Sequence, residues 1–271
     1  MSSSILKKKL ETSSNYSVID IFEKAARKAG KILISDFGKI ENFQIQSKEI
    51  GDFVTTVDIK VEKILLDALQ QYYPNASYIT EESDEIKGDK ETIVIDPIDG
   101  TSNFIHGIPL IGIVIGRVYE GEITDGVIFN PILNEFYWAT KGVGAWCNNK
   151  KIKVSNRKKL ENCLIGNSIP HANRRYQNYL DEIDNIAKKC SGLRSTGAAA
   201  IDLAFVASGK TDAFWQRNLK LWDISAGVLL VKEAGGKITQ PNGVQWKINN
   251  QDILASNTLI HQQILDELKI K

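Results

Sequence analysis

Hydrophobic residues recur every three or four positions between residues 17 and 37, and this period predicts an amphipathic helix that ends at Gly38. Its apolar positions are Val18, Phe22, Ala25, Ala29, Ile32 and Leu33. A second periodic segment begins at Asp58 and ends before Pro74, with apolar positions at Ile59, Leu65, Leu66 and Leu69. Aspartate is common at helix N-caps, so we expect Asp58 to cap this second helix.

Short apolar or alternating runs in the middle of the chain predict strands. A short strand is expected at 77–80, and a buried strand at 92–95 that ends at Asp96. Three further segments are expected to be consecutive antiparallel strands because turn residues separate them: 111–119, 122–129 and 135–139.

The second half of the chain alternates between the two patterns. Strands are expected at 162–167, 212–215 and 253–255. Helices are expected at 173–189, 197–208, 223–234 and 258–269. This alternation indicates layers of sheets and helices. We expect a flexible tail over 1–16, an N-terminal α+β half over 17–150 and a C-terminal α/β half over 151–271.

The amino-acid composition argues against nucleic-acid-binding and membrane-binding proteins. Hydrophobic residues make up 42% of the 271 positions and charged residues 25%, which is typical of a soluble globular protein. The 34 basic and 33 acidic residues leave a net charge of +1, so no global field attracts nucleic acid or an anionic membrane. The basic residues between 150 and 159 lack interleaved aromatic residues, and we interpret them as a solvated surface.

No membrane span is expected, because no apolar run reaches about 18 residues. No secretory signal is expected, because residues 1–16 have no apolar h-region and Glu11 interrupts their basic character. The three cysteines are far apart in the sequence, which argues against a disulfide framework and a zinc site. We therefore expect a cytoplasmic protein with reduced thiols.

Five acids are candidates for a shared site: Asp58, Glu81, Asp96, Asp99 and Asp223. Carboxylates that lie close together resist joint ionisation unless cations neutralise them. Carboxylate oxygens suit hard ions such as Mg²⁺, which also binds substrate phosphate.

The segment from Asp96 to Asn103 adds a possible phosphate site. Gly100 permits close approach of the backbone, and the amides of Thr101 to Asn103 would attract an anion if they open a helix. The hydroxyl of Thr101 would either orient a water molecule or simply cap that helix. Asp223 likewise has an alternative role as a cap at the start of its helix.

Four stretches, in this order, resemble the inositol monophosphatase family of Mg²⁺-dependent, lithium-sensitive phosphatases. They are Asp52-x-Val54-Thr55-x-x-Asp58, Glu81-Glu82-Ser83, Asp96-Pro97-Ile98-Asp99-Gly100-Thr101-Ser102-Asn103-Phe104 and Trp222-Asp223-Ile224-Ser225-Ala226-Gly227. The resemblance covers nearly the whole chain. It implies an α+β fold, a layered α/β/α/β/α sandwich of the inositol monophosphatase and fructose-1,6-bisphosphatase type, usually found as a homodimer.

The resemblance also implies roles for individual residues. Two or three Mg²⁺ ions would be bound by Glu81, Asp96, the carbonyl of Ile98, Asp99 and Asp223, with Asp58 near a weaker ion. Glu81 and Thr101 would activate the attacking water, and Asp99 would also contact the substrate hydroxyl. Phosphate would be held by Gly100, Thr101 and Ser102. Further substrate contacts would come from Gly197, Ala198, Gln216 and Asp223.

Two positions depart from the family pattern, and both concern the alcohol rather than the phosphate. Gln216 stands where the family commonly has glutamate, and Ala198 where many members have threonine or serine. We therefore expect a hydrolase of a small sugar or polyol phosphate, with inositol-1-monophosphate as the leading substrate. Alternatives in the same fold are fructose-1,6-bisphosphatase, histidinol-phosphatase and 3′-phosphoadenosine 5′-phosphate phosphatase. An alternative of another class is a regulatory protein that contacts RNA polymerase.

Overall fold

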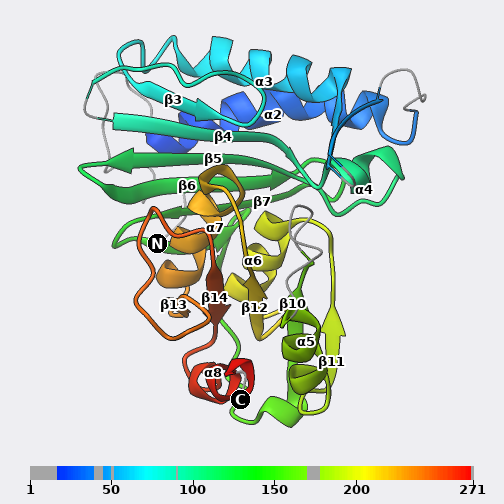
Figure 1. Cartoon of the computed structure of the whole chain (residues 1–271). Coiled ribbons are helices and arrows are strands. Elements are labelled where there is room, and N and C mark those ends of the chain that lie inside the picture. Colours follow the sequence, from blue (N-terminus) through cyan, green and yellow to red (C-terminus); the bar gives the residue numbers. More distant parts are fainter. Residues whose placement is uncertain (1–16, 40–44, 50–51, 90, 170–177, 270–271) are drawn as a thin grey trace.

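The computed structural model describes residues 17–39, 45–49, 52–89, 91–169 and 178–269. The tail expected over 1–16 and the first residues of the helix expected from 173 lie outside these ranges. Helices and sheets alternate in five layers (Figure 1). This architecture confirms the layered α/β/α/β/α sandwich that the family resemblance implies.

The first layer contains two helices, α2 (Val18–Asp36) and α3 (Thr56–Leu69). Helix α2 begins after Ser17, whose side chain accepts a hydrogen bond from Asp20 N. It ends at the C-cap Phe37, and Gly38 follows with a φ of 69°. The predicted helix at 17–37 and its glycine stop are thus confirmed.

The prediction that Asp58 caps the second helix, α3, is wrong. The N-cap is Thr55, and Asp58 is the third helical residue. Asp58 Oδ2 accepts hydrogen bonds from Thr55 N at 2.8 Å and from Thr55 Oγ1 at 2.6 Å. The two residues form a capping box, in which the threonine occupies the cap and the acid faces back toward it. A hairpin of β1 (Ile45–Glu49) and β2 (Asp52–Thr55) leads into this helix.

The second layer is a seven-stranded sheet in sequence order, in which only β3 and β4 run parallel. Its strands are β3 (Ser77–Thr80), β4 (Glu91–Asp99), β5 (Gly112–Tyr119), β6 (Glu122–Asn130), β7 (Glu135–Thr140), β8 (Gly144–Cys147) and β9 (Lys150–Ile152). The three predicted antiparallel strands are confirmed as β5 to β7. The predicted end of β4 at Asp96 is wrong, because the strand continues through Asp99.

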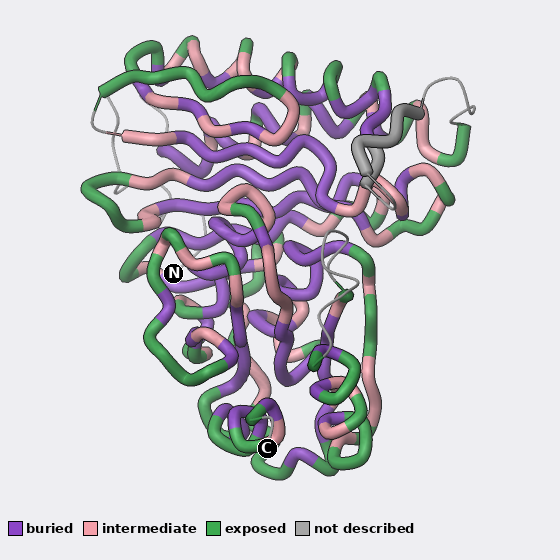
Figure 2. The backbone as a smooth tube through the Cα atoms, in the orientation of Figure 1, coloured by how far each residue is buried: buried purple, intermediate pink, exposed green. Residues whose placement is uncertain are grey.

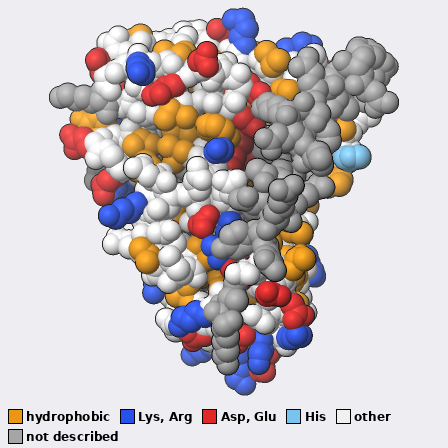
Figure 3. Space-filling view, viewed as in Figure 1, with side chains coloured by type: hydrophobic (Ala, Val, Ile, Leu, Met, Phe, Trp, Pro, Cys, Tyr) orange, Lys and Arg blue, Asp and Glu red, His pale blue; other side chains and the backbone are white. Residues whose placement is uncertain are grey.

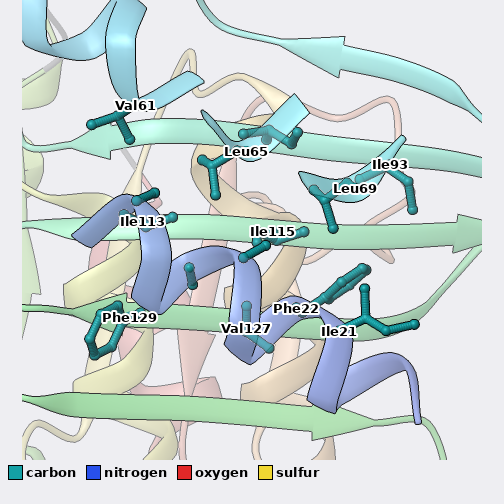
Figure 4. Packing of buried hydrophobic residues seen from close by; sticks show 14 of the residues in the cluster. Ile21, Phe22, Val61, Leu65, Leu69, Ile93, Ile113, Ile115, Val127 and Phe129 are labelled. Carbon is teal, nitrogen blue, oxygen red and sulfur yellow. The ribbon is translucent and has the colours of Figure 1, made fainter. Parts of the chain in front are cut away.

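Helices α2 and α3 cover one face of this sheet. Figure 4 shows Phe22 and Leu65 directed toward strand residues such as Ile113 and Ile115. These side chains are fully buried, and the burial of each one stabilises the fold by roughly 1.5–3 kcal/mol relative to leaving it in water.

The third layer lies on the other face of the sheet and consists of α6 (Ala199–Ala207) and α7 (Leu221–Glu233). Small residues let α7 approach the strands closely. A Cβ atom added at Gly116 would lie 2.5 Å from Ser225 Oγ, and one at Gly126 would lie 2.8 Å from Ala226 Cα. The helix predicted from Asp223 therefore exists, but it begins at Leu221 and places Asp223 third.

The fourth layer is a five-stranded sheet with the order β11-β10-β12-β14-β13. Its strands are β10 (Leu164–Asn167), β11 (Gly192–Arg194), β12 (Ala213–Gln216), β13 (Lys237–Thr239) and β14 (Ile253–Ser256). The last layer contains α5 (Tyr179–Ala187) and α8 (His261–Leu268). Three buried clusters fill the spaces between layers, and the middle one joins both sheets to α6 and α7 (Figure 2).

The surface matches the balanced charge of the sequence. Figure 3 shows acidic and basic side chains interspersed over the visible face. Within the described ranges, no helix combines the length and the apolar character that crossing a bilayer requires.

Candidate active site

The parallel pair of strands β3 and β4 brings the first two acids together. Thr80 pairs with Ile95, so Glu81 and Asp96 follow at the same edge of the sheet. Parallel strands end at the same edge, which is where rigid sites are commonly built. Asp96 is only 1% exposed.

A β-bulge places Asp99 on the same face as Asp96. Asp96 pairs with Val114 and Asp99 with Gly112, so β4 contains one residue more than β5 across this interval. In a regular strand, residues three apart point to opposite faces, and the extra residue reverses this. Pro97 lies in the bulge and lacks an N–H, while Ile98 N donates to Asp96 Oδ1 at 2.9 Å.

Gly100 turns the chain from β4 into the short helix α4 (Thr101–Ile105). Its φ is 91°, and a Cβ atom here would lie 3.0 Å from the carbonyl oxygen of Leu110, so glycine is required. The first N–H groups of α4 have no acceptor within the helix. Thr101 Oγ1 lies 3.1 Å from both Asp58 Oδ1 and the carbonyl oxygen of Ile98. Thr101 therefore connects Asp58 to the site.

The third layer supplies the opposite wall. Asp223 accepts a hydrogen bond from Lys220 N at 2.7 Å in the first turn of α7. The first amides of α6 hold Asp99, because Ala199 N donates to Oδ1 at 3.1 Å and Ala200 N to Oδ2 at 2.8 Å. Asp99 thus joins the two walls, a role that its position in the sequence does not reveal.

The turn before α6 is fastened to the first sheet by Asn103. Its Nδ2 donates to the carbonyl oxygens of Leu110 and Thr196, both at 2.7 Å. Gly197 adopts a φ of 77°, and a Cβ atom there would lie 3.1 Å from Asn103 Oδ1. The turn therefore needs glycine and a small amide partner.

These elements enclose a cavity of about 130 Å³. It brings together ten of the predicted residues: Glu81, Asp96, Ile98, Asp99, Gly100, Thr101, Ser102, Gly197, Gln216 and Asp223. Asp58 does not line the cavity and reaches it only through Thr101. Ala198 is buried, and its neighbour Ala199 lines the cavity instead. Ser168 and Leu219 also line it, and neither carries a sequence pattern that would identify it.

The cavity is strongly acidic, since its described lining contains four carboxylates and no Lys, Arg or His. Burial raises the pKa of Asp96 well above its usual value, and repulsion from Glu81, Asp99 and Asp223 raises it further. Burial followed by repulsion from Asp223 likewise raises the pKa of Asp99. Burial also raises the pKa of Asp58. A bound cation would relieve this cost.

The donor set fits a hard divalent cation in its chemistry. Each carboxylate oxygen of Asp99 accepts one amide and keeps a lone pair for a further partner. The described residues contain no group of three or more His, Cys, Asp or Glu side chains already placed to hold one metal ion. The ligand assignments for individual residues therefore stay predictions.

Gln216 contributes an unsatisfied polar atom. Its Oε1 is buried and has no hydrogen-bond partner among the described residues. A buried acceptor without a donor costs roughly 1–3 kcal/mol. Because Gln216 lines the cavity, a rotation of its amide would expose this shielded oxygen to a ligand hydroxyl, which would provide the missing donor.

Glu62 is a supporting residue that the sequence pattern did not reveal. It is 2% exposed, and its Oε2 accepts a hydrogen bond from Glu82 N at 2.9 Å. Its Oε1 accepts a hydrogen bond from Ser83 Oγ. Glu62 lies four residues after Asp58, on the same side of α3, and holds the turn that contains Glu81.

Comparisons with known proteins agree with this geometry. A model of the inositol monophosphatase family matches residues 14–271. The chain is 41% identical over 251 residues to a Caulobacter vibrioides protein named inositol-1-monophosphatase, covering 90% of this chain and 98% of that protein. It is 35% identical over 259 residues to a Pseudomonas aeruginosa protein named Nus factor SuhB, covering 93% and 96%.

Among solved structures, the extragenic suppressor protein suhB from Bartonella henselae matches with a TM-score of 0.90 and 40% identity. The match covers 93% of this chain and 98% of that chain. Because the relatives carry different names, their names alone do not identify the substrate.

Proposed function

The chain belongs to the inositol monophosphatase family, and on this premise we propose that it is a Mg²⁺-dependent phosphomonoesterase acting on a small polyol phosphate. Inositol-1-monophosphate is the leading candidate. The observation that carries the proposal is the small cavity in which four carboxylates, with no described basic residue, adjoin the amides that open α4.

The metal-binding residues would be Glu81, Asp96, the carbonyl of Ile98, Asp99 and Asp223, with Asp58 near a weaker ion. Two or three Mg²⁺ ions, when bound, would neutralise these acids and make a water molecule more acidic. Phosphate would lie against the amides of Gly100, Thr101 and Ser102, because helix-start amides favour anions.

Thr101 and Asp58 provide a route for a proton. The Thr101 hydroxyl has a single proton, and donating it to Asp58 Oδ1 leaves the oxygen lone pairs facing other donors. A water molecule in the cavity could donate to that oxygen. The raised pKa of Asp58 makes its carboxylate a better proton acceptor. Glu81, in the cavity wall, is the second candidate base.

The alcohol would be selected on the opposite wall, by Gly197, Gln216 and Asp223, with Ala199 lining the cavity in place of the buried Ala198, while Asp99 would contact the alcohol's hydroxyl. The unsatisfied Gln216 Oε1 supports a hydroxyl donor at this place. A cavity of about 130 Å³ favours a compact alcohol. It argues against a nucleotide, whose adenine would have to remain outside.

A substrate panel with and without chelator tests the proposal. Purified protein should release phosphate from inositol-1-phosphate in Mg²⁺, and release should stop in excess EDTA and return when Mg²⁺ is restored. Fructose-1,6-bisphosphate, histidinol phosphate and 3′-phosphoadenosine 5′-phosphate should be poorer substrates. Equal turnover in EDTA would disprove the metal requirement, and preference for another substrate would disprove the choice of inositol phosphate.

A second candidate function is a regulatory protein that contacts RNA polymerase, because one similar protein is named Nus factor SuhB. The two functions separate in an Asp96→Asn variant, which should lose phosphatase activity without changing the outer surface. Retained binding of this variant to purified RNA polymerase would support the regulatory role. The homodimer belongs to the same proposal, and sedimentation at several concentrations tests it.

A further inference from the structure

A second and larger pocket lies at the C-terminal end of α7. Its volume is about 490 Å³, compared with about 130 Å³ for the catalytic cavity. This size falls within the roughly 300–1,000 Å³ that is typical of small-molecule sites. We call it the α7 pocket and define it by Ile123, Lys141, Lys232, Glu233, Trp246 and Ile248.

The α7 pocket is separate from the catalytic cavity. Asp223, in the first turn of α7, lines the cavity, whereas Lys232 and Glu233, at the end of the helix, line the pocket. Asp223 and Lys232 are nine residues apart, which is about 13 Å along a helix axis. The two sites share no lining residue.

Both acids of the pocket already have partners. Glu122 forms an ion pair with Lys141. Glu233 accepts two backbone hydrogen bonds, from Gly142 N at 2.8 Å and from Gly144 N at 2.9 Å. The pocket is therefore not an acidic site with charge left to attract a cation.

Lys232 has a different environment. Among the described residues no carboxylate lies within ion-pair distance of it, and its Nζ lies 5.6 Å from the centroid of the Trp246 ring. Desolvation lowers the pKa of this ammonium group; Glu122 raises it and Lys141 lowers it. The three lysines that line the pocket outnumber its two glutamates.

The floor of the pocket is apolar. Val228 and Leu229 are buried, and Ile123 and Ile248 are partly buried beside them. Trp246 is 6% exposed, and its indole Nε1 has no hydrogen-bond partner among the described residues. An apolar surface below an ammonium group that has no carboxylate partner among the described residues suits a ligand with both an anionic group and an apolar body.

We propose that the α7 pocket binds a small organic anion with a flat apolar or aromatic body. The anionic group would lie at Lys232, and the body would cover Ile123, Ile248 and the edge of Trp246. This proposal does not depend on the phosphatase assignment, because it uses none of the catalytic residues.

The aromatic sulfonate 8-anilinonaphthalene-1-sulfonate provides a direct probe. Its fluorescence should rise on binding to the folded wild-type protein and should saturate at one equivalent. Lys232→Met removes the charge but keeps an apolar stem at an exposed position, and it should weaken binding roughly tenfold, which corresponds to about 1.4 kcal/mol. Phosphatase activity should remain unchanged in this variant.

Lys63→Met is the matched control, because Lys63 is an exposed lysine on α3, far from the pocket, and pairs with Asp67. Binding should be unaffected by this change and by saturating Mg²⁺ with inositol-1-phosphate. Absence of saturable binding would overturn the proposal. Equal weakening by both lysine variants, or displacement of the probe by the substrate, would also overturn it.

Discussion

The two walls of the catalytic cavity are built differently. The wall from the seven-stranded sheet carries Glu81, Asp96 and Thr101. Ile98 N donates to Asp96, Thr101 bonds to Asp58, and Glu62 holds the turn that follows Glu81. The wall from the third and fourth layers offers backbone amides, the glycine at 197 and the amide of Gln216, whose Oε1 has no partner in the described structure. The polar groups of the first wall already have partners that fix their positions, whereas the second wall contains a hydrogen-bond acceptor that is still unpaired.

This difference indicates a division of labour. Fixed carboxylates and helix-start amides suit the invariant part of a phosphomonoester, which is the phosphate with its metal ions. An unsatisfied amide suits the variable part, which is the alcohol. Asp99 joins the walls, because it leaves β4 and is held by the first amides of α6. Changes in the first wall should therefore affect turnover, and changes in the second, apart from the proposed metal ligand Asp223, should affect substrate choice.

The strongest test of the first wall is Asp96→Asn. The amide oxygen can still accept the hydrogen bond from Ile98 N, but the negative charge is lost. We expect kcat/KM to fall by more than about 100-fold, because loss of a ligand should exceed the 10–100-fold effect of its outer partners. Steady-state phosphate release at saturating Mg²⁺ measures this.

Stability provides the control for that variant. Burial and the neighbouring acids disfavour the charged form of Asp96, so its removal should not lower the free energy of unfolding in EDTA. If the variant is less stable than the wild type, the loss of activity is explained by misfolding rather than by the loss of a metal ligand. Full activity of the variant would show that Asp96 is not a metal ligand.

Thr101→Ala tests the proton route on the same wall. The change removes the hydroxyl that bridges Asp58 Oδ1 and the site, so we expect kcat to fall by about 10²–10³-fold, within the range of general acid–base catalysis. Thr101→Ser keeps the hydroxyl and should retain most activity. Equal losses in the two variants would assign Thr101 a packing role.

Much of this first wall could be predicted from the sequence, because its chemistry is local. Asp96, Asp99, Gly100 and Thr101 lie within six residues, and the strand before them is continuously apolar. For two acids outside this wall, the predicted positions differ from the structure by small shifts. Asp58 and Asp223 were expected as helix caps or helix starts and are both the third residue of their helices. In each case the acid faces back to the cap, so its sequence pattern resembles a cap.

The support for the site could not be predicted, because it depends on long-range contacts. Asn103 bonds to Thr196, 93 positions away, and Asp99 bonds to Ala200, 101 positions away. Glu62 resembles any polar residue of an amphipathic helix until the fold places the Glu82–Ser83 turn against it. Strands β9, β11 and β13 were missed because three residues carry too little periodicity, and β8 was missed because its four residues do not alternate between apolar and polar.

Glu62→Gln tests whether this support matters to the first wall. Glutamine offers one acceptor oxygen and one donor amide in place of two acceptor oxygens. If its oxygen keeps the Glu82 amide, the Ser83 hydroxyl has to reverse and accept, and both bonds lose the strength that the carboxylate charge gives them. We expect apparent Mg²⁺ affinity to fall by roughly tenfold, as is usual for outer partners of metal ligands. Titration of activity with Mg²⁺ measures this change.

Ser83→Ala completes a double-mutant cycle with Glu62→Gln. If both residues act through one hydrogen bond, the double variant should lose less than the sum of the two single losses. Additive effects would show that Glu62 acts elsewhere.

Gln216→Glu tests the second wall and should act on selectivity more than on turnover. A carboxylate is acceptor-only, so it should favour a substrate that presents several hydroxyl donors. We expect the ratio of kcat/KM for inositol-1-phosphate to that for a simple alkyl phosphate to rise by about tenfold, equal to about 1.4 kcal/mol. An unchanged ratio would show that Gln216 has no role in selecting the alcohol.

The smallest effect on activity is expected for Asp202→Asn, which lies behind the second wall. Asp202 is fully buried in α6, and its Oδ2 accepts a hydrogen bond from Thr196 Oγ1 at 2.7 Å. Burial raises its pKa from 3.8 to about 8, although Thr196 lowers it in part. An asparagine oxygen can keep the threonine contact, so turnover should change little.

The pH dependence of stability should change instead. Because the folded pKa of Asp202 is raised, its contribution to stability is fully present below about pH 4 and is lost as pH rises through about 8. The free energy of unfolding of the wild type in EDTA should therefore fall over this window, by at most about 1.4 kcal/mol per pH unit from this group. The variant lacks that slope, and the contribution of Asp96 cancels in the difference. Asp99 also contributes to both proteins, but the Asp202 charge raises its pKa, so the difference includes the loss of that repulsion. Urea unfolding at several pH values measures this effect. The free energy of unfolding of the variant should increase relative to that of the wild type as pH rises. If the two plots of this free energy against pH are parallel, Asp202 does not titrate in this range.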